Sequence, residues 1–242
     1  MKQYYIKEYS DSHHTKVIII PIFDDNYVYI LTDETRKAFI VDPGQAESVI
    51  GVIEELKLQP THLLITHSHQ DHVGGVKKIK SRYPSMALFD YRNCINETNF
   101  FQWNDRSFTV FKTPGHWPDH ICFFEERNKI LFCGDILFRF GCGRIFDGTF
   151  EELYSSLQKI KMLPPDTDVF CTHEYTRQNL AFCMSQQLVN RDDFSEQERI
   201  LIESTPSLPV KLETELRFNP FLKVATLEGL KKLRILRNEF KS

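Results

Sequence analysis

One stretch of the chain, residues 61–75, concentrates side chains that can bind metal ions. It begins as a short apolar run typical of a buried strand and ends in two glycines typical of a tight turn. Side chains two residues apart in an extended segment point the same way, so His67 and His69 can reach one ion. Asp71 and His72 follow at the turn, where they are better placed to face a second ion. Imidazole and carboxylate ligands together suit zinc, iron or manganese.

Three further segments place a side chain of metal-binding type directly after an expected strand: His116, Asp135 and His173. Either His116 or Asp135, considered alone, could be an ordinary turn residue. Ligands at four strand ends, however, indicate that they gather at one edge of a sheet. The complete set holds five histidines and two carboxylates. That number exceeds the needs of one four- or five-coordinate ion and favours two ions that share a bridging carboxylate.

The elements that must position these ligands follow from the apolar patterns along the chain. Thr149 and Glu152 form a capping box that predicts the start of one helix. The patterns predict strands at residues 17–23, 27–31, 38–41, 61–65, 86–91, 107–112, 120–125, 130–133 and 168–172, and helices at residues 46–56 and 150–160.

The chain changes character beyond residue 177, where the apolar spacing is helical and no strand pattern follows. A second capping box, formed by Ser195 and Glu198, supports this interpretation. Strands mixed with helices, followed by helices alone, indicate an α/β body with an all-α appendage. We therefore expect an α/β domain at residues 1–176 and a helical domain at residues 177–242.

The composition is that of a globular protein with a sizeable core: 242 residues, 41% hydrophobic and 26% charged. A net charge of -3 gives no general case for a nucleic-acid partner, and no apolar run approaches the 18 residues of a membrane span. Residues 1–16 lack the apolar core of a signal peptide, and none of the six cysteines forms a C-x-x-C pair. These features predict a cytoplasmic protein with reduced thiols, and we expect a monomer.

Motifs spread along the chain accompany the candidate ligands. They are Ile20-Pro21 to Asp25-Asn26-Tyr27, Thr113-Pro114-Gly115-His116, Gly134-Asp135, Gly141-Cys142-Gly143-Arg144, His173-Glu174-Tyr175-Thr176 and Asn219-Pro220-Phe221. The H-x-H-x-D-H motif of residues 67–72 resembles that of the metallo-β-lactamase superfamily. With the other motifs, the chain resembles the glyoxalase II, or hydroxyacylglutathione hydrolase, family over nearly its full length.

This resemblance implies a four-layer αββα metallo-β-lactamase sandwich with an all-α C-terminal subdomain. Residues 1–176 would thus form the catalytic domain, and residues 177–242 the helical substrate-binding domain. It also implies two divalent metal ions, with zinc favoured and iron or manganese as alternatives. The resemblance assigns His67, His69 and His116 to one ion, Asp71, His72 and His173 to the other, and Asp135 to a bridge between them; Asp71 and Asp135 are thereby expected to be catalytic. The implied substrate contacts are Arg144, Phe146, Tyr175, Arg234 and Arg237.

The implied reaction is hydrolysis of the thioester of S-D-lactoylglutathione and related 2-hydroxyacylglutathiones to glutathione and D-lactate, the second step of methylglyoxal detoxification. Hydroxide on the dinuclear centre would attack the thioester, and a thiol with a pKa of about 8.5 can leave as thiolate without a general acid. Residues 221–242 hold six basic and two acidic side chains, a net +4 that leaves -7 for the rest. This patch suits the carboxylates of glutathione, although the cations could merely complement the dipole of the last helix.

The chain departs from the family pattern at positions that concern the substrate pocket rather than the ligands. The departures are Trp117-Pro118-Asp119 in place of a small glycine-containing turn, Phe146 where some members have tyrosine, Arg237 where some have lysine, and Cys171-Thr172 before His173 where glycine is common. Asp42 could support a ligand histidine or simply begin an Asp-Pro-Gly turn, and the turn is favoured. His120 is expected to have a structural role or to support a ligand.

Three rival functions stay open at this point. A glutathione persulfide dioxygenase of the same superfamily would use one iron held by two histidines and one carboxylate, and the metal count would distinguish it. A nuclease of the same fold would need a broader basic groove than the overall charge suggests. A glutathione- or metal-binding module without catalysis is disfavoured by the complete ligand set.

Overall fold

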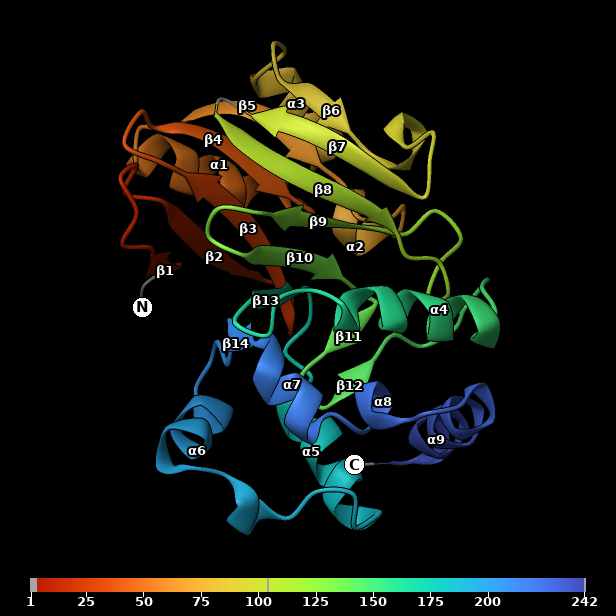
Figure 1. Cartoon of the computed structure of the whole chain (residues 1–242). Coiled ribbons are helices and arrows are strands. Elements are labelled where there is room, and N and C mark those ends of the chain that lie inside the picture. Colours follow the sequence, from red (N-terminus) through yellow and green to blue (C-terminus); the bar gives the residue numbers. More distant parts are fainter. Residues whose placement is uncertain (1–3, 104, 242) are drawn as a thin grey trace. The chain divides into compact units, whose positions relative to one another are not determined.

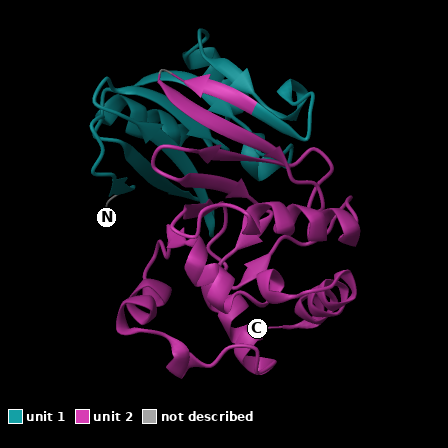
Figure 2. Ribbon diagram, in the orientation of Figure 1, with its two compact units in different colours: residues 1–99 teal, residues 100–242 magenta. Residues whose placement is uncertain are grey.

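The computed structural model describes residues 4–103 and 105–241, so the outermost ends of the two predicted domains, residues 1–3 and 242, lie outside the described residues. The chain forms two compact units, residues 1–99 and residues 100–242 (Figure 2). The functional division after residue 176 stays a prediction. No helix in the described part of the chain has the length and hydropathy that a membrane span requires.

The first unit is built on a six-stranded sheet with the strand order β1-β2-β3-β4-β5-β6 (Figure 1). The first four strands pair antiparallel, whereas β4, β5 and β6 pair parallel. The elements are β1 (Tyr5–Glu8), β2 (Lys16–Ile22), β3 (Asn26–Thr32), β4 (Lys37–Val41), α1 (Ala46–Glu55), β5 (Gln59–Leu64), α2 (Gln70–Val73), α3 (Val76–Arg82), β6 (Ala87–Phe89) and a short 3-10 turn (Tyr91–Asn93).

Helices α1 and α3 lie in the crossover connections that parallel strands require. The helix predicted at residues 46–56 is confirmed. Val49, Val52 and Ile53 of α1 are buried with Ile79 of α3 against the apolar side chains of the sheet. Since β4 and β5 are parallel, their carboxyl ends meet at one edge of the sheet. The segment that begins at Asp42 after β4 and the segment that begins at residue 65 after β5 therefore leave the sheet at the same edge.

The second unit contains a six-stranded sheet with the strand order β14-β13-β10-β9-β8-β7 (Figure 1). Strands β8 and β10 both run antiparallel to β9, and β13 runs parallel to β10, so β8, β10 and β13 share one direction. The segments that hold His116, Asp135 and His173 therefore leave the sheet at one edge. The strands are β7 (Thr98–Trp103), β8 (Arg106–Lys112), β9 (Ile121–Glu125), β10 (Ile130–Gly134), β13 (Asp168–Cys171) and β14 (Val210–Lys211).

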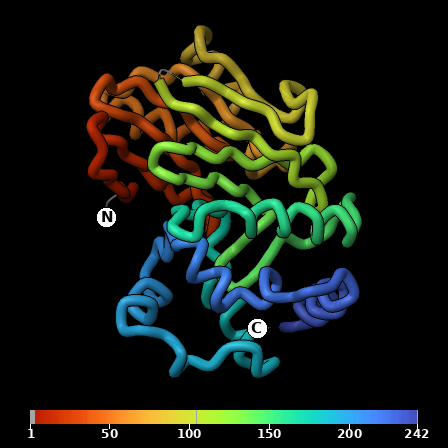
Figure 3. The backbone as a smooth tube through the Cα atoms, viewed as in Figure 1, coloured from red at the N-terminus to blue at the C-terminus, as the bar shows by residue number. Residues whose placement is uncertain are grey.

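Helices dominate the rest of the second unit, and the tube in Figure 3 shows them in the teal to blue part of the chain. A two-stranded hairpin of β11 (Leu137–Phe138) and β12 (Gly141–Cys142) follows β10. The predicted capping boxes at the starts of α4 and α6 are both present. The helices are α4 (Phe150–Lys161), α5 (Thr176–Ser185), α6 (Glu196–Glu203), α7 (Leu212–Phe218), α8 (Pro220–Lys223) and α9 (Leu227–Glu239), with a 3-10 turn at Arg191–Asp193. Strand β14 is an exception to the all-helical expectation for this region.

Candidate functional site

His67 and His69 lie in the segment that leaves β5, and the backbone of His69 is extended as predicted. Nε2 of His67 lies 2.9 Å from Nδ1 of His69, so the two rings turn one nitrogen each toward a common point. Nδ1 of His67 lies 3.1 Å from the Thr66 hydroxyl. This contact orients the His67 ring from the side opposite His69.

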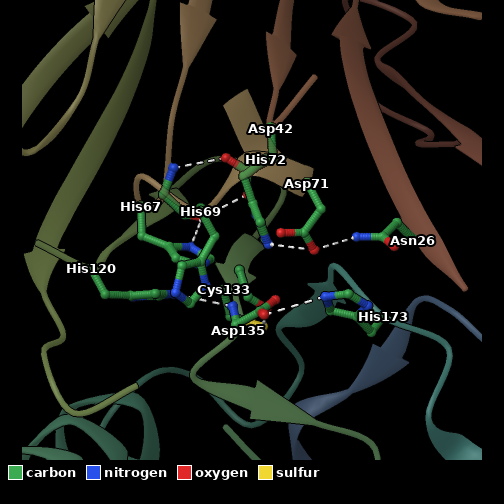
Figure 4. A network of polar contacts seen from close by, with 12 residues as sticks. Asn26, Asp42, His67, His69, Asp71, His72, His120, Cys133, Asp135 and His173 are labelled. Carbon is green, nitrogen blue, oxygen red and sulfur yellow. Dashed lines mark hydrogen bonds and ion pairs between the residues drawn. The ribbon is translucent and has the colours of Figure 1, made fainter. Parts of the chain in front are cut away.

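Asp71 and His72 lie on the short helix α2 rather than in the turn that the sequence predicted. Nε2 of His72 lies 3.6 Å from Oδ2 of Asp71, and the His72 side chain is fully buried. The amide of Asn26 donates a hydrogen bond of 2.9 Å to the same Asp71 oxygen (Figure 4). Asn26, which the sequence identifies only as part of a motif, thus holds a candidate ligand.

Asp42 supports a candidate ligand as well as beginning a turn. Its carboxylate accepts hydrogen bonds from Thr66 N at 2.8 Å and from the Thr66 hydroxyl at 2.6 Å, and Oδ2 lies 3.0 Å from Nδ1 of His72. The turn that the sequence favoured is also present, since Gly44 N donates to the Asp42 carbonyl. A Cβ on Gly44 would stand 1.8 Å from the carbonyl oxygen of Asp71, so only glycine lets this turn approach α2.

In the second unit, Asp135 faces two histidines with one oxygen. Its Oδ2 lies 3.5 Å from Nε2 of His116. The same oxygen lies 3.3 Å from Nε2 of His173 (Figure 4). The backbone N of Asp135 donates to Nε2 of His120 at 3.1 Å, and Nδ1 of His120 lies 2.8 Å from the Thr113 hydroxyl. His120 therefore holds the backbone at Asp135, in line with the supporting role expected for it.

His116 is held through its other ring nitrogen. Nδ1 donates a 2.7 Å hydrogen bond to the backbone carbonyl of Arg144, a contact that no side-chain pattern could have revealed. The Phe146 ring meets the His116 ring edge-on at 5.3 Å and remains 60% exposed. The Arg144 guanidinium lies over Phe146, 5.4 Å from the ring centre. Two predicted substrate contacts thus flank a candidate ligand.

The ring of His173 is stacked on that of Tyr175, with centroids 4.7 Å apart and planes only 8° from parallel. Phe138 of the β11–β12 hairpin packs edge-on against both rings, at 5.9 Å from His173 and 5.1 Å from Tyr175. Tyr175 therefore packs on a candidate ligand. Its predicted contact with substrate stays a prediction.

The two arginines of α9 differ in their surroundings. Arg234 is only 6% exposed, and its guanidinium donates a 2.7 Å hydrogen bond to the carbonyl of Cys142. Arg237 is half-buried and donates at 3.0 Å to the side-chain oxygen of Asn179. Burial, followed by the neighbouring Arg234 charge, lowers the pKa of the Arg237 guanidinium. The structure thus gives Arg234 a packing role that the sequence did not predict.

The donor groups have the chemistry and spacing of metal ligands. Hydrogen bonds from Nδ1 to the Asp42 carboxylate and to the Arg144 carbonyl leave Nε2 of His72 and of His116 with the lone pair that binds a metal. The donor atoms of each pair within a unit are 2.9–3.6 Å apart. This range includes the separation of about 3.4 Å between two ligand atoms of a tetrahedral zinc ion. The histidine and aspartate groups can hold divalent metal ions.

Comparison with known proteins identifies the family. The model of the metallo-beta-lactamase superfamily matches residues 22–86 and 84–173, and that of the hydroxyacylglutathione hydrolase C-terminus matches residues 174–240. The hydroxyacylglutathione hydrolase of Bdellovibrio bacteriovorus is 41% identical, covering 92% of this chain and 97% of that protein. That of Klebsiella pneumoniae is 39% identical and covers 90% of each.

Among solved structures, the crystal structure of the BLEG-1 B3 metallo-beta-lactamase matches with a TM-score of 0.66 at 22% identity, covering 85% of this chain and 99% of that chain. This likeness concerns the fold. With the two mixed sheets and the largely helical C-terminal region, it confirms the predicted metallo-β-lactamase fold class. The chain therefore belongs to the metallo-β-lactamase superfamily and, within it, to the hydroxyacylglutathione hydrolase family.

Proposed function

We propose that this protein hydrolyses the thioester of S-D-lactoylglutathione and related 2-hydroxyacylglutathiones, giving glutathione and the hydroxy acid. The observation that carries the proposal is that the candidate metal ligands precede, on one chain, a region that matches the hydroxyacylglutathione hydrolase C-terminus. The names of the similar Bdellovibrio and Klebsiella proteins support it. The division into a catalytic domain at residues 1–176 and a substrate-binding domain at residues 177–242 is part of the proposal, and the junction of the two family models at residues 173 and 174 supports it.

We assign two ions to the site, with zinc as the favoured metal. His67, His69 and His116 would hold one, Asp71, His72 and His173 the other, and Asp135 would bridge them. The two Nε2 atoms that face Oδ2 of Asp135 support the bridging role. When bound, the ions would lower the pKa of a shared water molecule and stabilise negative charge on the thioester oxygen.

The residues of this chain orient the donors, and no residue is required to protonate the leaving group. Asp42 and the Arg144 carbonyl hold protons at Nδ1 of His72 and His116, which keeps their Nε2 atoms deprotonated. His120 fixes the backbone of Asp135. A glutathione thiol has a pKa of about 8.5, so it can depart as thiolate and needs no proton from the protein.

Substrate recognition is assigned to Arg144, Phe146, Tyr175, Arg234 and Arg237. Arg144 and Phe146 lie beside the candidate ligand His116, and Tyr175 lies beside His173. Guanidinium groups form strong charge-assisted hydrogen bonds with carboxylates such as those of glutathione. The cysteine pattern of the sequence supports our further proposal of a cytoplasmic protein, and we propose that it acts as a monomer.

Metal content and thioester hydrolysis measured on one purified sample test this proposal. We expect close to two ions per chain and loss of hydrolysis after chelation, with recovery when zinc is restored. A fully active sample with one metal ion would exclude the dinuclear assignment. A sample with one iron that consumes oxygen in the presence of glutathione persulfide, without thioester hydrolysis, would establish the dioxygenase alternative instead.

A further inference from the structure

The side chain of Asn219 lies at the centre of a buried polar network that involves the β11–β12 hairpin. Asn219 is fully buried, and its Nδ2 lies 3.0 Å from the carbonyl oxygen of Phe138, 2.9 Å from that of Gly141 and 2.9 Å from Oε2 of Glu215. Its Oδ1 accepts a hydrogen bond from Phe221 N and so caps α8. One amide therefore connects the hairpin to two C-terminal helices.

Glu215 of α7 extends this hold on the hairpin. Oε2 of the buried Glu215 carboxylate accepts a 2.8 Å hydrogen bond from Phe140 N, and Oε1 lies 3.8 Å from Nε of the buried Arg139. Asn219 and Glu215 together contact residues 138 to 141 in succession. The two side chains thus determine where the tip of the hairpin lies.

The position of this hairpin matters for a candidate metal ligand. The Phe138 ring packs edge-on against His173 and Tyr175, with interplanar angles of 79° and 72°. Because Asn219 binds the carbonyl of Phe138 itself, it fixes the backbone from which this ring projects. A shift of the hairpin would move the ring that keeps the His173–Tyr175 stack in place.

A second connection reaches His173 from the other side. The carboxylate of Glu174, the residue after His173, accepts hydrogen bonds from Ser207 N at 2.8 Å and from the Ser207 hydroxyl at 2.7 Å. The carbonyl of Ser207 accepts a 3.2 Å hydrogen bond from Nη1 of Arg139, which belongs to the hairpin turn. The hairpin and the backbone at His173 are therefore held by one continuous set of contacts.

We propose that Asn219 is a positioning residue for the metal ligand His173, acting through the β11–β12 hairpin and Phe138. The proposal rests on the proposed function, because it takes His173 as a ligand. The two buried carbonyls that Asn219 serves would lose its amide as a donor in its absence. The loss of buried hydrogen bonds drives local rearrangement. The C-terminal region thereby shapes the metal centre, in addition to any contact with glutathione.

Asn219→Ser tests the proposal, because serine can still cap α8 but cannot donate to both carbonyls of the hairpin. Asn190→Ser is the matched control, since Asn190 also caps a short helical turn through its side-chain oxygen but is exposed. Metal affinities are measured by competition titration of metal-free protein, and the ligand geometry by the visible absorption spectrum of the cobalt form. Loss of direct partners of metal ligands weakens binding 10- to 100-fold, so we expect about 10-fold weaker binding of one ion in Asn219→Ser.

The cobalt spectrum of Asn219→Ser should change, while all properties of Asn190→Ser stay as in the wild type. Phe138→Leu, which keeps the backbone carbonyl but removes the aromatic ring, should weaken the binding of the same ion. A lower melting temperature with unchanged affinity and spectrum in both Asn219→Ser and Phe138→Leu would overturn the proposal and leave Asn219 a structural role. A wild type that binds no metal would contradict the proposed function. A wild type that binds metal, with unchanged binding in the two variants, would contradict only the role of Asn219, so the two failures are distinguishable.

Discussion

The hydrogen bond at Nδ1 of a histidine decides what its Nε2 atom can do, and Asp42 makes this bond for His72. Its carboxylate also accepts two hydrogen bonds from Thr66, beside His67. One buried carboxylate therefore connects two candidate ligands of the first unit. Its effect is exerted on the orientation and basicity of the ligands, not on the substrate.

Asp42→Asn should therefore weaken metal binding about 10- to 100-fold, the usual cost of losing such a partner of a ligand. Asp33→Asn is a suitable control, because Asp33 is also buried and also accepts hydrogen bonds from the backbone and hydroxyl of a threonine, Thr35. Competition titration with a chelator of known affinity measures the effect. Equal affinities in the two variants would show that Asp42 serves only its turn.

The arginines of α9 should respond differently to substitution. A charge-assisted hydrogen bond contributes about 1.5–3 kcal/mol, and the partial exposure of Arg237 to solvent should reduce this contribution. Arg237→Ala should therefore lower kcat/KM about 3- to 30-fold, with unchanged metal content. Arg234→Ala should in addition lower the free energy of unfolding by about 1–3 kcal/mol, because it leaves the buried Cys142 carbonyl without its donor.

These losses should shrink with a small thioester that lacks the tripeptide, and the exposed Lys232 on the same helix offers an alanine control. Kinetics on both substrates and urea unfolding provide the measurements. Equal losses on both substrates would mean that the basic helix supports the fold only.

Sequence reasoning reached the candidate ligands through side-chain types placed after strands, and β5, β10 and β13 do end shortly before His67, Asp135 and His173. It could not reach the Arg144 carbonyl, since a backbone oxygen has no residue signature. The sequence favours only a turn at Asp42, because Asp-Pro-Gly is a common turn sequence and gives no sign of a contact with a histidine. Its second role depends on β4 and β5 being parallel neighbours, a long-range pairing that local patterns do not reveal.

At the scale of elements, the same reasoning located the long strands and helices, whose periodic patterns extend over several residues. It missed β1, β7 and the two-residue strands β11, β12 and β14. Strands of two residues carry no detectable alternation and exist only because a partner is already in place. The hairpin that contacts His173 is therefore among the elements that the sequence could least reveal.

Strand β9 ends in a buried ion pair with its neighbour β8, and this pair should make stability depend on pH. Nη1 of Arg106 lies 3.4 Å from Oε1 of Glu125, and both side chains are fully buried. Burial raises the pKa of Glu125 above its ordinary value of 4.5, although Asn128 N and Arg106 act in the opposite direction. The folded state therefore holds this proton more tightly than the unfolded state does.

The resulting stabilisation is present below about pH 4.5 and is lost as the pH rises through the folded-state pKa. The neutral side chain of Glu125→Gln has no such dependence. The free energy of unfolding of the wild type, relative to this variant, should therefore fall as the pH rises above about 4.5. Urea unfolding at several pH values measures the difference, and a constant difference would contradict the raised pKa.

At the scale of the whole molecule, membership of a superfamily that includes β-lactamases raises the question of substrate choice. A thiolate leaves without protonation at neutral pH, whereas the nitrogen of an amide requires a proton donor. We expect kcat/KM for a glutathione thioester to exceed that for a β-lactam by at least about 10³-fold, or about 4 kcal/mol of barrier. Comparable hydrolysis of both by one zinc-loaded sample would assign the protein to another branch of the superfamily.

Strand β14 has a consequence for any attempt to shorten this protein. It comes from the C-terminal region, yet it pairs antiparallel with β13, the strand that leads to His173, and forms the outer edge of the second sheet. A chain ending at residue 176 would expose the hydrogen-bonding groups of β13, and an uncovered edge strand is a template for pairing between molecules. Such a fragment should self-associate in light scattering, so the proposed catalytic domain depends for its solubility on the region after it.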